Sequence, residues 1–237
     1  MQVTLTGSPA SRASRGVLLI GNHVSWLDIC VIASVTGATF VAKSEVARWP
    51  VIGRIATGFG AFLHERGDLM DVWRVKNTVA TALRQGSPVV AFPEGTTGWS
   101  ASLMPFYPAL AQAAIDAGAI VQPVAIRYRD LHGQPSTAAP FLGDQTFVDS
   151  LNAILREPAI CAELYFGEPF AASGRTRREI TAIAQRFIAR ALGLHESRLV
   201  ADPRRLRNGP SALSDQNRRN APRAPLLARP AGPVKAG

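Results

Sequence analysis

Short runs of β-branched and aliphatic residues alternate along this chain with longer segments of helical periodicity. Several of the runs are apolar on both faces, as are strands of parallel sheets that are covered by helices on both sides. The alternation predicts a single α/β domain with a mainly parallel sheet flanked by helices on both sides. Strands are expected at Val17–Gly21, Thr39–Ala42, Gly60–Leu63, Val89–Phe92, Ile120–Arg127 and Ile160–Phe166, and helices at Trp26–Val35, Asp68–Arg84, Tyr107–Ala117 and Arg175–Leu192.

The 237 residues suffice for one α/β domain with a substantial core, but their formal charge of +9 is unevenly distributed. Residues 1–173 contain 12 Lys and Arg against 13 Asp and Glu, whereas residues 174–237 contain 14 against 4. We therefore expect a folded domain over residues 1–195. Residues 196–237 are expected to form a basic, Pro/Arg-rich tail that does not fold independently.

The tail leaves three interpretations open. Its basic residues could bind anionic lipid headgroups, bind nucleic acid, or simply remain solvated. It contains no aromatic residue and so lacks the base-stacking platform of a single-strand binder. No nucleic-acid partner is therefore expected.

The apolar segments are too short or too interrupted to span a membrane. His23 and Asp28 divide the most apolar region, residues 16–41, so no transmembrane helix is predicted. The N-terminus lacks the pattern of a signal peptide. Cys30 and Cys161 are far apart and have no metal-ligand spacing, which predicts buried cysteines in a reducing compartment and no metal site.

A histidine and an aspartate follow the first predicted strand, in the segment 21–28. The C-terminal ends of strands are where ligands bind in open α/β sheets, and histidine is the usual general base near neutral pH. Asp28 could accept a hydrogen bond from one ring nitrogen of His23 and leave the other free to take a proton. Alternatively, Ser25 and Asp28 resemble a capping box, in which Asp28 stabilises only the helix N-terminus.

Two further segments place polar residues at strand ends. In the segment 60–66, Arg66 is a candidate for binding a phosphate, and its alternative is a salt bridge to a nearby acid. In the segment 89–98, Gly95 would let backbone N–H groups approach a ligand, and Thr96 adds a hydroxyl donor. Glu94 is expected to accept hydrogen bonds from a substrate hydroxyl or from Arg66. An ordinary strand–turn connection is the alternative for this segment.

Together these segments resemble, in order and spacing, the four motifs of the glycerolipid acyltransferases. His23 and Asp28 match the His-x4-Asp motif, and residues 60–66 match the second block. Phe92–Thr96 matches the Phe-Pro-Glu-Gly-Thr block, and Pro123 matches the proline of the last motif. The resemblance covers residues 17–127. It implies catalysis by His23 and Asp28 and substrate binding by the residues Arg66, Glu94, Gly95 and Thr96.

The resemblance implies transfer of a fatty acyl group from acyl-carrier protein or coenzyme A to the hydroxyl of a lysophospholipid such as 1-acyl-glycerol-3-phosphate. The thioester is the donor substrate, and no other cofactor or metal is expected. The enzyme would lie peripherally on the anionic cytoplasmic face of the cell membrane. In the family an arginine usually follows the threonine that matches Thr96, whereas this chain has Thr97. The resulting Phe-Pro-Glu-Gly-Thr-Thr sequence resembles the branch that acylates lyso-ornithine lipid, which is therefore an alternative acceptor. A non-catalytic lipid-binding protein is the alternative of another class.

Overall fold

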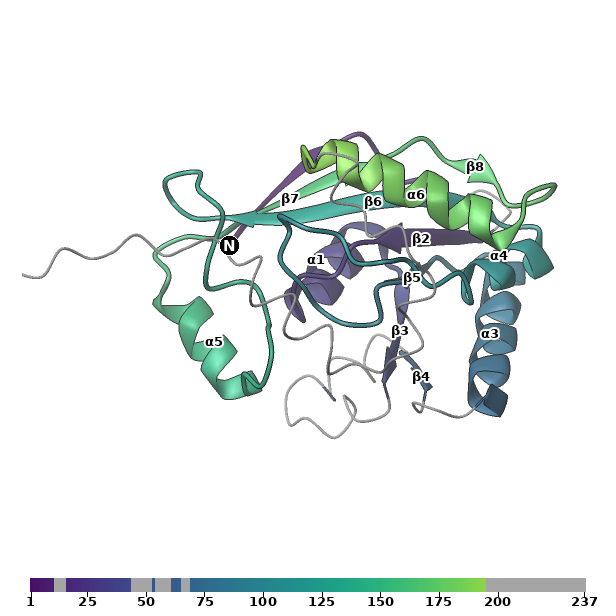
Figure 1. Ribbon diagram of the computed structural model, residues 1–237, viewed down its shortest axis with the longest axis horizontal. Helices are drawn as coiled ribbons and strands as arrows, with labels where there is room; N and C mark the ends of the chain where they lie inside the picture. The colour runs from purple at the N-terminus through teal and green to yellow at the C-terminus, as the bar shows by residue number, and fades with distance from the viewer. Residues whose placement is uncertain (11–15, 44–52, 54–60, 65–68, 195–237) are drawn as a thin grey trace, which may run out of the picture.

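The computed structural model describes residues 1–10, 16–43, 53, 61–64 and 69–194. Its centre is one eight-stranded sheet in the order β1-β7-β6-β2-β5-β3-β4, with β8 beside β6 (Figure 1). Pairing is parallel throughout except where β7 and β8 run antiparallel to β6. The strands are β1 Gln2–Thr6, β2 Val17–Gly21, β3 Thr39–Lys43, β4 Phe62–His64, β5 Val89–Ala91, β6 Ile120–Arg129, β7 Cys161–Phe166 and β8 Phe170–Ala171.

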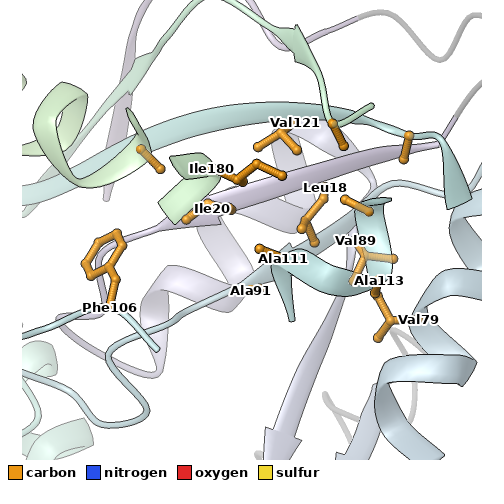
Figure 2. Close-up of a cluster of buried hydrophobic side chains, with 14 of the residues drawn as sticks. Leu18, Ile20, Val79, Val89, Ala91, Phe106, Ala111, Ala113, Val121 and Ile180 are labelled. Carbon is orange, nitrogen blue, oxygen red and sulfur yellow. The ribbon is translucent and has the colours of Figure 1, made fainter. Parts of the chain in front are cut away.

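Helices cover both faces of the sheet, as the sequence predicts. Alternate residues of β2 point to opposite faces, so Leu18 and Ile20 enter one core while Leu19 enters the other. The first core lies under α3 Leu69–Arg84, α4 Ala111–Ala117 and α6 Arg177–Ala191 (Figure 2). The second lies under α1 Leu27–Thr36. The fold class is therefore confirmed, and β2 is buried along its whole length because both faces are covered.

Three elements have no counterpart among the predicted ones. Strand β1 is exposed throughout and pairs with β7, far away in the sequence, so it lacks the apolar pattern of a buried strand. Helix α5, Phe147–Arg156, stands at one end of the molecule (Figure 1), and β8 has only two residues. Helix α4 begins at Ala111 rather than Tyr107, since the Tyr107 N–H donates to the Pro93 carbonyl in a loop.

Gly16 lies where the chain enters β2 and touches the C-terminal end of α3. Its N–H donates to the Leu83 carbonyl at 3.0 Å, and its carbonyl accepts from Ile120 N–H at 3.0 Å. A Cβ atom at this position would lie 2.2 Å from the Leu83 carbonyl oxygen, a backbone atom. Only glycine therefore allows this approach between the helix and the strand.

Replacing Gly16 with alanine is expected to lower the free energy of unfolding by about 2–3 kcal/mol, because the end of α3 must move away from β2. Urea denaturation measures the change. Gly133→Ala is the control: Gly133 lies in a turn, at φ +73°, and a Cβ there meets nothing within 4 Å. The control should lose only about 1 kcal/mol from its left-handed backbone. Equal losses of unfolding free energy in both variants would show that the backbone at Leu83 moves away from the added methyl group at no cost.

Candidate active site

The site begins where β2 ends, with an asparagine that extends the strand pairing. The Asn22 Nδ2 donates to the Ile126 carbonyl and its Oδ1 accepts from Ile126 N–H, both at 2.9 Å. A side-chain amide thus takes the place of a peptide group and continues the pairing of β2 with β6 by one step beyond Gly21 and Val124. Asn22 is buried, so its bonds fix the start of the loop that carries His23.

His23 is held through both its backbone and its ring. Its N–H donates to Glu94 Oε1 at 2.9 Å, and its carbonyl accepts from Gly98 N–H at 2.8 Å. The ring stacks on Phe92 with centroids 4.1 Å apart, and Nδ1 lies 2.7 Å from Asp28 Oδ2. A carboxylate only accepts, so Nδ1 carries the proton. Nε2 has no hydrogen-bond partner within the described residues, and 18% of the side chain is exposed, which suits a proton acceptor.

Asp28 is fully buried and accepts four hydrogen bonds from the described residues. Its Oδ2 accepts from His23 Nδ1, from Val24 N–H at 2.6 Å and from Ser25 N–H at 2.9 Å. Its Oδ1 accepts from the Tyr128 hydroxyl at 2.7 Å. The bond to Ser25 N–H is one half of the predicted capping box. The other half is not formed, since Asp28 N–H donates to the Ser25 backbone carbonyl and α1 is capped at Trp26 without a side-chain bond. The Asp28 carboxylate thus bonds both the loop before α1 and the His23 ring.

Glu94 holds two loops together. Its Oε1 accepts from His23 N–H and its Oε2 from Met104 N–H at 3.0 Å. Burial raises the pKa of the Glu94 carboxyl to about 8, although the N–H groups of Met104 and His23 lower it. Both oxygens are thus bonded to the chain itself, a role that the sequence pattern did not reveal. The expected contact of Glu94 with a substrate hydroxyl stays a prediction.

Gly95 and Thr96 lie directly beside this carboxylate. Gly95 has φ +68° and donates its N–H to the Phe92 carbonyl at 3.1 Å, which closes a turn that favours glycine. Thr96 makes no hydrogen bond to any described residue, so its hydroxyl and N–H are available to a ligand. Thr97 is different, since its hydroxyl donates to the Phe141 carbonyl. Substrate binding by Gly95 and Thr96 stays a prediction.

The structure therefore brings His23, Asp28, Glu94, Gly95 and Thr96 to one place, whereas Arg66 lies outside the described residues. Within those residues, no group of His, Cys, Asp and Glu side chains could hold a metal ion. Sequence reasoning missed Asn22 and Tyr128. The strand expected to end at Arg127 runs on to Arg129, and Tyr128 lies on the same face of it as Ile126. The Tyr128 hydroxyl on this otherwise apolar face of β6 is the feature of the sequence that indicates a buried hydrogen-bond partner.

A sequence profile of the acyltransferase family matches residues 2–127, more than half of the chain. The chain belongs to the acyltransferase family. The matched region contains the bonded pair His23 and Asp28 together with the Phe92–Thr96 turn. The predicted family and the O-acyltransferase class are therefore confirmed.

Curated relatives of this acyltransferase act on lysolipids. The lyso-ornithine lipid O-acyltransferase of Pseudomonas aeruginosa is 36% identical over 176 residues, 74% of this chain and 67% of that protein. The enzyme of the same name from Brucella abortus is 38% identical over 190 residues, covering 74% and 70%. The 1-acyl-sn-glycerol-3-phosphate acyltransferase of Neisseria gonorrhoeae is 41% identical over 138 residues, covering 58% and 54%. The matches thus span 54% to 70% of these three relatives.

The fold also has a counterpart among solved structures. The crystal structure of the 1-acyl-sn-glycerophosphate acyltransferase PlsC from Thermotoga maritima matches with a TM-score of 0.56. The match covers 80% of this chain and 72% of the other at 22% sequence identity, and it supports the α/β architecture. Among the helices described for this acyltransferase, none combines the length and apolar character needed to cross a bilayer.

The raised pKa of Glu94 makes stability depend on pH. The pKa is about 8 in the folded protein against an ordinary 4.5, so between these values the folded state binds the proton more tightly. The free energy of unfolding should therefore fall as pH rises from about 5 to about 8, by up to about 1.4 kcal/mol per pH unit from this group. Glu94→Gln cannot titrate, and urea denaturation of both proteins across this range isolates the effect. A pH-independent difference between them would contradict the raised pKa.

Proposed function

We propose that this acyltransferase moves a fatty acyl group from an acyl thioester to the free hydroxyl of a lysophospholipid such as 1-acyl-glycerol-3-phosphate. The observation that carries the proposal is the state of the His23 ring. Nδ1 donates to the buried Asp28 carboxylate, and Nε2 is left without a partner in the described part of the chain. This is the arrangement of a general base whose tautomer is fixed.

The reaction follows from that geometry. Nε2 of His23 takes the proton of the acceptor hydroxyl while its oxygen attacks the thioester carbonyl carbon. The carbon–sulfur bond then breaks, and the imidazolium returns the proton to the departing thiolate, which gives a free thiol and the diacyl lipid. Asp28 stabilises the imidazolium. No covalent acyl-enzyme is required, and the thiol carrier is acyl-carrier protein or coenzyme A.

Lyso-ornithine lipid is a second candidate acceptor. The two relatives described above with that name match 74% of this chain, against 58% for the Neisseria enzyme. In addition, the residue after Thr96 is Thr97 and not an arginine that could bind a phosphate. The Thr97 hydroxyl is bonded to the Phe141 carbonyl. A zwitterionic headgroup needs less positive charge at the site. Arg66 remains the proposed headgroup ligand for a phosphate-bearing acceptor.

Helix α5 supports a peripheral position at the anionic cytoplasmic surface of the membrane. One edge of the helix is anchored beside the active site, since Trp26 Nε1 donates to the buried Ser150 hydroxyl at 3.1 Å and its ring meets Phe147 edge-on. The other edge carries Val148 and Leu155, which are 61% and 71% exposed. An amphipathic helix with an open apolar edge suits the bilayer interface, where a lysolipid resides.

His23→Ala is expected to reduce turnover about 10²–10⁴-fold without unfolding the protein, because a positioned base contributes about that much to the rate. Release of free thiol from acyl-carrier protein and coenzyme A thioesters, with and without added lysolipid, measures the reaction. Mass spectrometry of products from a panel of lysolipids identifies the acceptor. His132→Ala is the control, since His132 is exposed in the turn after β6, where its N–H donates to Asp130.

Three outcomes distinguish the functional classes. Thiol release that depends on the lysolipid supports the acyltransferase, whereas release without an acceptor indicates a hydrolase. Release in neither condition indicates a lipid-binding protein. Full turnover by the purified His23→Ala variant would refute the mechanism.

Replacing both Val148 and Leu155 with aspartate should weaken binding to lipid vesicles at least about tenfold, because two exposed side chains lose about 1.5 kcal/mol or more each on transfer from the bilayer. Sedimentation with vesicles that contain anionic phospholipid measures binding. Trp73→Asp is the matched control: Trp73 is 60% exposed, but it lies on α3 at the opposite end of the molecule (Figure 1). Equal losses of vesicle binding in the two variants would show that α5 does not contact the membrane.

A further inference from the structure

The two oxygens of the Asp28 carboxylate are held unequally. Oδ2 accepts from His23 Nδ1 and from the N–H groups of Val24 and Ser25, so it has three donors. Oδ1 accepts from one described group, the Tyr128 hydroxyl at 2.7 Å. The orientation of the carboxylate therefore depends on Tyr128 at one oxygen and on the backbone of the loop at the other.

We propose that Tyr128 is a positioning residue of the acyl-transfer reaction, which locks the Asp28 carboxylate so that Oδ2 faces His23. The proposal rests on the function proposed above. Tyr128 acts through Asp28, since its hydroxyl is bonded to that carboxylate. Its hydroxyl replaces the water that would otherwise solvate Oδ1.

The sheet determines where the Tyr128 hydroxyl lies. Asn22 bonds both polar groups of Ile126, which fixes the start of the His23 loop against β6. Tyr128 follows two residues later and points to the same face, where its ring is buried in the core under α1. The ring cannot swing away without opening that core. The loop and β6 are thus joined at two points, one at each end of the segment from Asn22 to Asp28.

The environment also keeps the hydroxyl in its donating form. Burial raises the pKa of Tyr128 well above its ordinary value, and the charge of Asp28 raises it further. A neutral tyrosine can donate to the carboxylate but cannot neutralise its charge. The Tyr128 hydroxyl therefore restricts the rotation of the Asp28 carboxylate through a single donated hydrogen bond.

Tyr128→Phe is the test, because it removes the hydroxyl and keeps the ring. We expect kcat to fall about tenfold with KM for both substrates unchanged, since the lost bond serves the base and not substrate binding. Tyr165→Phe is the matched control. Its hydroxyl also donates to a carboxylate, Glu163 Oε2 at 2.8 Å, but from β7 and on the opposite face of the sheet. That variant should keep its kcat within about twofold.

A spectroscopic readout separates this proposal from the function on which it rests. The His23 Nδ1 proton, bonded to Asp28, should give a downfield proton resonance in protein labelled with 15N-histidine, assigned by its loss in His23→Ala. Tyr128→Phe should displace or broaden that resonance, and Tyr165→Phe should leave it in place. A protein that transfers no acyl group but shows this displacement would refute the proposed function and retain only the orientation of the Asp28 carboxylate by Tyr128.

Two results would overturn the role of Tyr128. One is an unchanged kcat together with an unchanged resonance in Tyr128→Phe. The other is a loss of activity that tracks only the loss of folded protein, with a normal resonance in the folded fraction. Should Tyr128→Phe not fold, 3-fluorotyrosine at position 128 keeps the ring and the hydroxyl but makes the hydroxyl more acidic. The resonance should then move relative to wild type, and no movement would equally refute the proposal.

Discussion

A carboxylate with no exposed surface dominates the architecture of this acyltransferase. Removing Asp28 from water is costly unless other donors replace the water, and an unpaired buried charge would be strongly destabilising. The donors come from a histidine ring, two consecutive N–H groups of one loop and a tyrosine on a strand 100 residues later. The loop, the start of α1 and the end of β6 must therefore all be in place before Asp28 is satisfied. Fold and site depend on the same bonds.

A second buried carboxyl group, that of Glu94, also bonds His23, but at its backbone. Asp28 bonds the ring of His23, whereas Glu94 bonds its backbone N–H and ties it to the loop of Met104. The ring is also stacked on Phe92, at the end of β5. The histidine is consequently fixed from its backbone, its ring face and one ring nitrogen. What remains free in the described structure is Nε2, the atom that takes the proton in the proposed reaction.

The sequence predicted the parts of this structure whose cause is local. The strand Val17–Gly21 is apolar on both faces, and the polar residues that follow it mark a strand end in any parallel sheet. Tyr128 and β1 depend instead on pairings between distant segments, and periodicity along one segment does not encode these. The role of Glu94 was also hidden, because a carboxylate that accepts backbone N–H groups leaves no trace in residue spacing. Arg66 and the basic tail stay predictions, since both lie outside the described residues.

The position of Trp26 connects the loop of His23 to α5, the helix proposed to meet the membrane. It lies between His23 and Asp28 in the sequence, yet its indole bonds Ser150 and meets Phe147, so the catalytic loop and α5 share one anchor. The segment before α5 is bonded to the same loop, through Phe141 N–H and the Val24 carbonyl at 3.0 Å. If the apolar edge of α5 rests on a bilayer, His23 and Asp28 would therefore lie at a fixed distance from the bilayer surface. A lysolipid whose acyl chain stays among its neighbours could then present its hydroxyl to Nε2 without leaving the interface, which avoids the cost of exposing that chain to water.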